Sequence, residues 1–105
     1  MEIRTRMGLV QIKYDNGILL SIANGFGSYT QNHFDVEKQT KIIENRDIFA
    51  SWTSEDVEIA IINSKGEYIT KEIVEGAKDL VTTVTVKQLI NIMQYLLSKE
   101  NEENE

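Results

Sequence analysis

The fold of this chain is organised around residues 14–29, which read YDNGILLSIANGFGSY. The Asn16-Gly17 pair is typical of the tight turn of a β-hairpin, and apolar residues alternate on both sides of it. A three-residue loop that ends on a left-handed Gly17 makes every facing pair on one side of the hairpin apolar. These pairs are Tyr14 with Ile18, Ile12 with Leu20, and Val10 with Ile22. The stretch therefore predicts two antiparallel strands in a register fixed by this loop.

The composition indicates one small globular domain. The chain has 105 residues, of which 41% are hydrophobic and 27% charged, and it has no cysteine, which excludes disulfides, thiolate zinc sites and thiol nucleophiles. Its net charge is −6, but four of the 17 acids follow Lys99, which leaves 13 acids against 11 bases over residues 1–99. We therefore predict a single domain over residues 1–99 and an acidic, disordered tail over residues 100–105.

The first residues carry no apolar segment of signal-peptide length, and no later run approaches the length of a membrane span. A cytoplasmic location without a membrane partner is the expectation. Ile3 to Arg6 is predicted to form a short first strand. Gly8 then marks either a turn into the next strand or a bulge within one longer strand, and the sequence leaves both open.

A second hairpin is predicted further along the chain. Residues 57–61 alternate apolar and other side chains, 64–66 form a turn that ends on Gly66, and 68–70 return as the second strand. Between the two hairpins, Asp35 is the expected cap of a helix that runs to about residue 45, and 48–53 read as a short strand.

The C-terminal helix has the most strongly specified start. Thr85 is the expected N-cap, Gln88 completes a capping box, and Leu80 to Val84 form the preceding strand. Six apolar residues share one helical stripe that should be buried: Val86, Leu89, Ile90, Met93, Leu96 and Leu97. The predicted fold is therefore α+β, with an antiparallel β-sheet built from two hairpins and packed against one C-terminal α-helix.

A glycine-rich loop is the principal candidate for a binding site. It comprises Gly25, Phe26, Gly27, Ser28 and Tyr29, and Phe34 follows nearby. Glycines let backbone amides approach an anion, and the aromatic side chains could stack on a base or insert into a partner. The loop lacks the third glycine of a dinucleotide fingerprint and the Lys-Ser/Thr ending of a P-loop, so a purely structural loop is the alternative.

Other constellations are weaker. His33, Asp35 and Glu37 have the spacing of metal ligands on an extended segment, and Ser28 with His33 and Asp35 supplies the residue types of a hydrolytic triad. Capping of a helix by Asp35 would break the metal-ligand spacing, and hydrolytic triads are normally assembled from separated elements and not from one loop. We therefore assign no catalytic residue, no metal and no cofactor.

Basic residues gather near the N-terminus. Arg4 and Arg6, with Lys13, give this region a local positive charge. They are too few for strong nucleic-acid binding, which depends on many phosphate contacts, so a nucleic-acid partner is not expected. Arg4 and Arg6 are instead candidates to hold the phosphate of a small ligand.

The chain resembles small uncharacterised proteins of tailed phages and prophages at residues 14–17, 21–22, 25–29 and 57–61, which read YDNG, SI, GFGSY and VEIAI. The resemblance implies an accessory protein that binds a host or defence protein, or that sequesters a small signalling nucleotide. It implies no catalytic residue.

Two hypotheses follow. The first is a non-enzymatic binding module, in this context an anti-defence protein, that acts by protein–protein contact through residues 25–34 and the outer face of the helix. The alternative is a nucleotide-binding module in which the same loop acts with Arg4 or Arg6, in one chain or across a homo-oligomer interface. A hydrolase that uses Ser28 or His33 is a third and weaker hypothesis.

Overall fold

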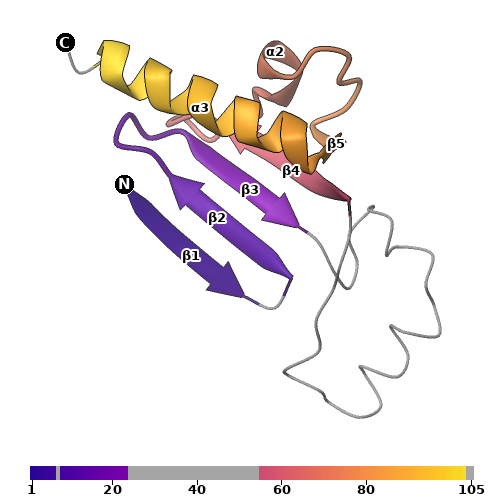
Figure 1. The fold of residues 1–105 in the computed structure, drawn as a ribbon. Coiled ribbons are helices and arrows are strands. Elements are labelled where there is room, and N and C mark those ends of the chain that lie inside the picture. The colour runs from indigo at the N-terminus through magenta and orange to yellow at the C-terminus, as the bar shows by residue number, and fades with distance from the viewer. Residues whose placement is uncertain (7, 24–54, 104–105) are drawn as a thin grey trace.

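The computed structural model of the protein describes residues 1–6, 8–23 and 55–103 (Figure 1). The elements are β1 (Glu2–Arg6), β2 (Leu9–Lys13), β3 (Leu19–Ala23), β4 (Asp56–Ile62), α2 (Thr70–Ile73), β5 (Val81–Thr85) and α3 (Val86–Glu103). The five strands form one antiparallel sheet in the order β1-β2-β3-β4-β5, and α3 crosses one face of it. The predicted α+β fold is therefore confirmed, with five consecutive strands in place of two separate hairpins.

The hairpin of β2 and β3 has the predicted register. Ile12 pairs with Leu20 and Val10 with Ile22. The Tyr14 amide donates to the Ile18 carbonyl oxygen at 2.8 Å, and the Gly17 amide donates to the Tyr14 carbonyl oxygen at 3.0 Å. Gly17 has a φ of +88°, the left-handed conformation that only glycine adopts without strain. The three-residue loop is thus confirmed.

The structure also decides between the two alternatives at Gly8. Arg6 at the end of β1 pairs with Leu9 at the start of β2, so β1 and β2 are separate antiparallel strands. Gly8 has a φ of +73° and lies in the turn between them. The bulge is excluded, and β1 becomes an edge strand of the sheet.

The predicted second hairpin needs a correction. Its turn closes as expected, since the Gly66 amide donates to Asn63 and Gly66 has a φ of +82°. The returning segment makes only one bridge, between Ile62 and Tyr68, and the chain then enters α2. On this side of β4 the strand partner is β5, which pairs with Asp56–Ala60, with Ala60 opposite Val81 and Asp56 opposite Thr85.

Thr70 explains where the second hairpin stops. This side chain is fully buried, and its hydroxyl accepts the Ile61 amide at 2.9 Å and donates to the Leu80 carbonyl oxygen at 2.6 Å. A hydroxyl therefore takes the place that a backbone carbonyl would occupy in a continued ladder. Thr70 joins β4 to the segment that leads into β5.

The start of α3 is formed as predicted. The Gln88 amide donates to Thr85 Oγ1 at 3.1 Å, and the Thr85 amide donates to Gln88 Oε1 at 2.8 Å. This is the reciprocal capping box, which satisfies two backbone donors that the first turn of a helix leaves free. Val84 and Leu89, on either side of the cap, are both buried in the core.

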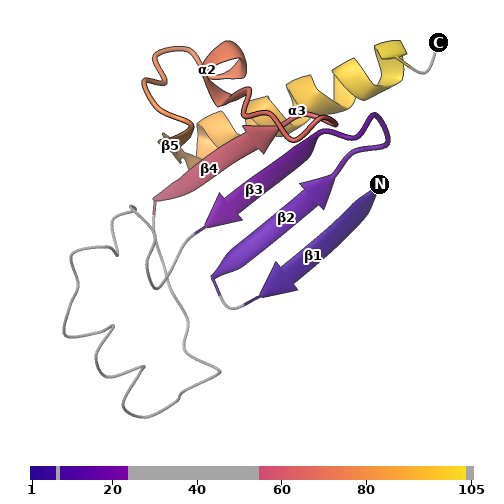
Figure 2. The ribbon, with the colours of Figure 1, turned by 180° about the vertical axis from the view of Figure 1, so that it is seen from behind.

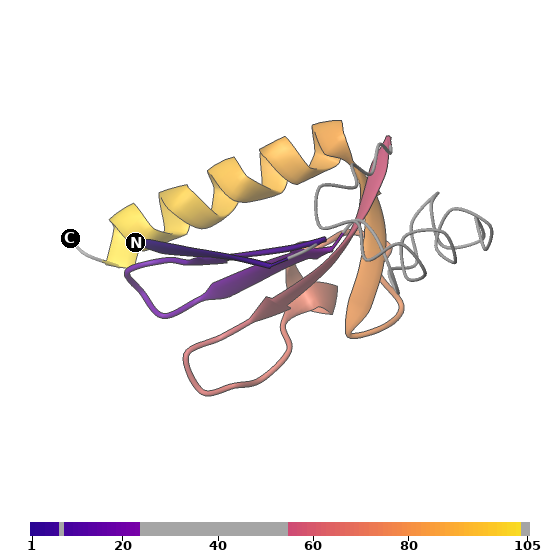
Figure 3. The same ribbon diagram turned by 90° about the horizontal axis from the view of Figure 1, so that it is seen from below.

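The buried face of α3 is rotated relative to the predicted stripe. Leu89, Leu96 and Met93 pack into the core with Leu20, Ile59 and Ile61 of the sheet. Val86, Ile90 and Leu97 were expected in the core but are 42%, 51% and 42% exposed. Seen along the sheet, α3 lies against one face of it (Figure 3), and in Figure 1 it crosses β3 and β4 and leaves β1 and β2 uncovered. The flank of α3 that faces β1 and β2 is therefore not packed closely against the sheet.

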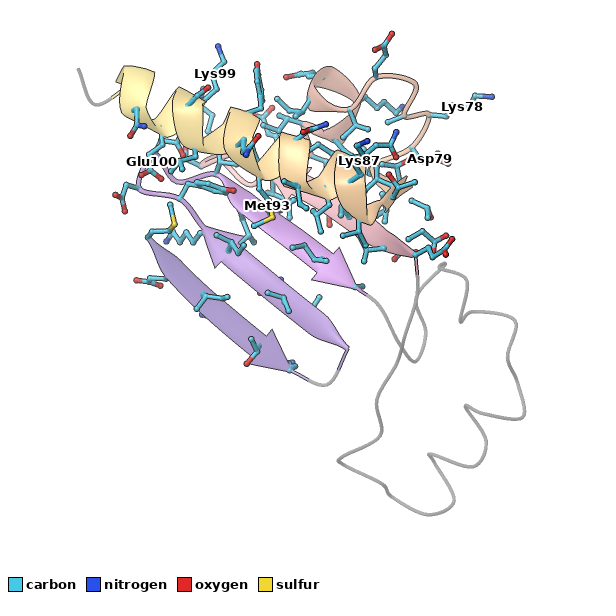
Figure 4. The ribbon with its side chains drawn as sticks, viewed as in Figure 1. Lys78, Asp79, Lys87, Met93, Lys99 and Glu100 are labelled. Carbon is cyan, nitrogen blue, oxygen red and sulfur yellow. The ribbon has the colours of Figure 1, made fainter. Side chains whose placement is uncertain are left out.

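The helix also extends beyond residue 99, where the sequence predicts the disordered tail to begin. Residues 100–103 continue α3, and Glu100 is only 6% exposed. Its carboxylate accepts the backbone amide of Asp15 at 2.8 Å, and Figure 4 shows Glu100 beside the turn that joins β2 and β3. A hydrogen bond from the β2–β3 turn thus holds the last turns of the helix.

The helix predicted after Asp35 and the strand predicted at 48–53 lie outside the described residues. Among the helices that are described, none combines the length and the apolar character needed to cross a membrane.

Candidate functional site

An apolar groove runs between α3 and the uncovered part of the sheet. We call it the α3–β2 groove. Its volume is about 310 Å³, and it is lined by Met1, Ile12, Tyr14, Ile90, Met93, Gln94 and Leu97. Gln94 is the one amide among these side chains, and none is charged. Figure 4 shows Met93 on the side of the helix that faces the strands.

The rotation of α3 produces this groove. Ile90 and Leu97 form its helical wall and are 51% and 42% exposed, whereas Leu89 and Leu96 on the adjacent stripe are buried. Ile12 of β2 forms the floor and stands next to Leu20, which the helix covers completely. The groove is thus a continuation of the hydrophobic core that opens to solvent at its side.

Tyr14 closes the end of the groove near the β2–β3 turn. It is 4% exposed, and its hydroxyl donates a long hydrogen bond of 3.4 Å to the Met93 carbonyl oxygen. Burial raises the pKa of Tyr14, and the negative charge of Glu100 raises it further. The phenol is therefore kept protonated, as a donor fixed between sheet and helix.

A charged cluster borders the same end. The amino group of Met1 forms an ion pair with Asp15, whose backbone amide is bound by Glu100. The hydrogen bond from this amino group lowers the pKa of Asp15, and the hydrogen bond to Asp15 raises the pKa of the amino group. Both groups are about half exposed, so the pair contributes little to stability.

The opposite face of the sheet carries the candidate arginines. Arg4 and Arg6 alternate along β1 and pair with Gln11 and Leu9 of β2, so the four side chains share one face. They line a pocket of about 250 Å³, which we call the arginine pocket. Viewed from behind, no helix of the described chain covers this face over β1 to β3 (Figure 2). Arg4 and Arg6, each predicted as a candidate to hold a phosphate, therefore lie together on a face of the sheet that no described helix covers there.

A wider hollow of about 650 Å³ lies beside β5. Its lining comes from the sheet and the turn before β5: Glu58, Asp79, Leu80, Val81, Thr82 and Thr83. Two acids and two threonines give it a mixed character, and none of the described helices contributes a second wall. It therefore offers a less defined recognition surface than the α3–β2 groove.

The glycine-rich loop lies outside the described residues. This applies to every one of its predicted site residues, namely Gly25, Phe26, Gly27, Ser28, Tyr29 and Phe34, and also to His33, Asp35 and Glu37. Of the predicted site residues the structure describes Arg4 and Arg6, which it brings together. Within the described ranges, no group of three or more histidine, cysteine or acidic side chains is arranged to hold a metal ion.

No protein-family model, no curated protein and no solved structure matches this chain. The site is therefore defined by its own geometry: an apolar groove on the α3 face of the sheet and a basic pocket on the other face. The groove can take up apolar side chains and exclude water from them, and the pocket can hold an anion by two guanidinium groups.

The apolar stripe of the sequence places Ile90 and Leu97 in the core, so the groove was not predicted. The sequence does contain a signal for the groove, because the predicted stripe includes two pairs of adjacent residues, Leu89 with Ile90 and Leu96 with Leu97. Adjacent residues on a helix point about 100° apart, so both members of each pair can be buried only under a wide cover. The apolar stripe is therefore wider than the part of α3 that the sheet can cover, and its uncovered residues, Ile90 and Leu97, form the wall of the groove.

Proposed function

We propose that this protein is a non-enzymatic binding module that acts by protein–protein contact, with the α3–β2 groove as its contact surface. The observation that carries the proposal is the exposure of Ile90 and Leu97 beside Ile12, which joins apolar side chains of helix and sheet in one concave surface. Contiguous exposed apolar surface of this kind is typical of interaction sites.

The expected occupant is a partner protein that inserts apolar side chains between α3 and β2. Covering the exposed half of Ile90 or Leu97 would contribute about 1 kcal/mol each. Gln94 at the rim offers a hydrogen bond that can orient the inserted segment, and Tyr14 closes the end. The resemblance to phage accessory proteins agrees with such a role and suggests a host or defence protein as the target.

Two matched variants test the groove. Ile90→Asp and Leu97→Asp place a charge in its wall, whereas Tyr95→Asp places the same charge on another side of α3, where Tyr95 is 44% exposed. Each bait is used for affinity capture from a bacterial host lysate, and each captured protein is then purified and titrated against all baits. We expect direct binding that is lost in the two groove variants and kept in Tyr95→Asp.

The proposal is wrong if the groove variants bind every purified partner as tightly as the original chain does. It is equally contradicted if no captured protein binds the purified chain directly. Circular dichroism of each variant separates loss of binding from loss of folding. The predicted contribution of the 25–34 loop is tested in the same experiment by changing Phe26, Tyr29 and Phe34 together to alanine.

A second candidate function rests on the arginine pocket. Arg4 and Arg6 beside Gln11 suit a phosphate, which supports the alternative of a small-nucleotide module. A thermal-shift screen with mono-, di- and cyclic nucleotides at low ionic strength should show stabilisation that Arg4→Ala with Arg6→Ala abolishes. Lys65→Ala, in the exposed turn after β4, is the control. Absence of any shift at high ligand excess would rule this function out.

A further inference from the structure

The edge strand β1 is the most exposed strand of the described sheet. All five of its residues are exposed, and β2 is its one neighbour in the strand order. Half of the backbone donors and acceptors of an edge strand point away from the sheet, where another strand can pair with them. The side chains of β1 show which strand would fit.

The sequence at the start of β1 is complementary to itself. If a second copy of β1 lies antiparallel with Ile3 opposite Ile3, then Glu2 of each copy faces Arg4 of the other. Opposite charges at facing positions stabilise a strand pair, and two such pairs form at once because the arrangement has two-fold symmetry. Centring the pair on Arg4 instead would place Glu2 opposite Arg6, but it would also bring two arginines together and leave Ile3 opposite Thr5.

The apolar side chains of β1 favour the same register. Ile3 and Met1 are 68% and 60% exposed, the highest values among the exposed large hydrophobic side chains of the described residues. Ile3 pairs with Ile12, so it stands on the face that α3 covers elsewhere. An Ile3–Ile3 contact across the two-fold axis would remove both side chains from water.

The other edge of the sheet lacks this complementarity. β5 reads Val-Thr-Thr-Val-Thr over Val81–Thr85 and carries no charge that could select a register or a direction. β1 carries both signs at alternate positions. Like charges on an edge strand repel a second strand, whereas the Glu2 and Arg4 pattern selects one orientation of it.

We propose that two copies of this chain associate through β1, antiparallel and centred on Ile3, so that their sheets join into one continuous sheet. A two-fold axis perpendicular to the sheet keeps both α3 helices on the same face, and therefore both α3–β2 grooves as well. Arg6 lies beyond the paired segment, so part of the arginine pocket stays accessible. A contact of about five residues a side is small, so the dimer is weak and reversible.

A charge exchange tests this interface without any partner or ligand. Glu2→Arg gives a β1 with two arginines at the facing positions, and Arg4→Glu gives a β1 with two glutamates. Each variant alone should self-associate at least about 10-fold more weakly than the original chain, because its facing pairs have like charge. An equimolar mixture of the two should form a heterodimer, and the double variant should dimerise like the original chain.

The measurement is sedimentation equilibrium at low ionic strength over a wide range of protein concentration. Glu72→Arg and Lys65→Glu change the net charge equally at exposed positions outside β1 and should leave self-association unchanged. Circular dichroism verifies that each variant is folded. A chain that stays monomeric at all concentrations would overturn the proposal. So would a dimer whose strength does not depend on Glu2 and Arg4, or single variants that fail to associate when mixed.

Discussion

Replacing Gly17 by alanine should destabilise the fold more than the same change at Gly66, although both glycines close a hairpin-type turn. Their backbones are nearly the same, with φ of +88° and +82°. Their surroundings differ, because a Cβ on Gly17 would lie 2.7 Å from the Cβ of Ser64, whereas a Cβ on Gly66 would meet nothing within 4 Å. The turn after β2 thus packs directly against the turn after β4.

The expected costs follow from these two terms. A left-handed alanine costs about 1 kcal/mol, which is the whole penalty at Gly66. At Gly17 the contact with Ser64 adds about 1–3 kcal/mol, because both atoms sit close to backbone and can retreat only if one turn moves. The total at Gly17 of about 2–4 kcal/mol is a large fraction of the stability of a small domain.

Urea denaturation followed by circular dichroism measures both costs. The double variant Gly17→Ala with Ser64→Gly isolates the contact, because removing the Cβ of Ser64 leaves its Cα as the nearest atom, at 3.4 Å. Relative to Ser64→Gly alone, the added alanine should then cost no more than it does at Gly66. Equal costs of the two single changes, or no rescue in the double variant, would refute the packing of the two turns.

Three further predictions concern hydrogen bonds and pH. Thr70→Val should cost about 2–3 kcal/mol in urea denaturation, because it leaves a buried amide of β4 unpaired, whereas Thr70→Ser should cost about 1 kcal/mol or less. Thr85→Ala should cost about 1 kcal/mol, and Thr85→Ser should be nearly neutral because serine still accepts the Gln88 amide; equal losses would contradict the capping role. The raised pKa of Tyr14 means that its protonated phenol stabilises the fold fully below the ordinary value of about 10, and that this contribution is lost as the pH rises through the folded-state pKa. In the Tyr14→Phe variant, the urea midpoint should therefore decrease less steeply with pH above about pH 10 than in the original chain. An equally steep decrease in the variant would show that Tyr14 does not cause it.

Local signals in the sequence were sufficient for the β2–β3 hairpin and for the start of α3. A one-residue slip of the hairpin would place Lys13 opposite Leu20, so the apolar pattern alone selects the register. The Thr85 and Gln88 capping box likewise depends on residues three positions apart. Where the determining contacts are within a few residues, the prediction was confirmed.

The pairing of β4 could not be derived in the same way. Ala60, Ile61 and Ile62 are three consecutive apolar residues, so alternation does not reveal which neighbours β4 has. The segment at 68–70 follows a good turn and was the nearest available partner. The buried hydroxyl of Thr70 ends this pairing. Nothing in the sequence around Thr70 indicates that its hydroxyl is buried or that it replaces a strand partner.

The rotation of α3 and the burial of Glu100 are tertiary effects. Which part of a wide apolar stripe is covered depends on the position of the helix over β3 and β4, and the helical period does not contain that information. Glu100 is held by a hydrogen bond from the backbone amide of Asp15, which lies 85 positions earlier in the chain. The sequence around Glu100 shows only a run of acids, which is typical of a solvated tail, so its burial could not be predicted. Of the candidate sites, Arg4 and Arg6 were named from the sequence as separate candidates, and the α3–β2 groove was not predicted.

The order of the described elements, in which α3 follows all of the strands, has a consequence for synthesis. Leu89 and Leu96 cover Leu20, Ile59 and Ile61, and they are translated after every strand of the sheet. A nascent chain that has released only residues 1–85 from the ribosome would present a sheet face whose apolar side chains are not yet covered by α3. We therefore expect the core over the sheet to close only after α3 has been translated, and the uncovered sheet to be the form of this protein that chaperones meet.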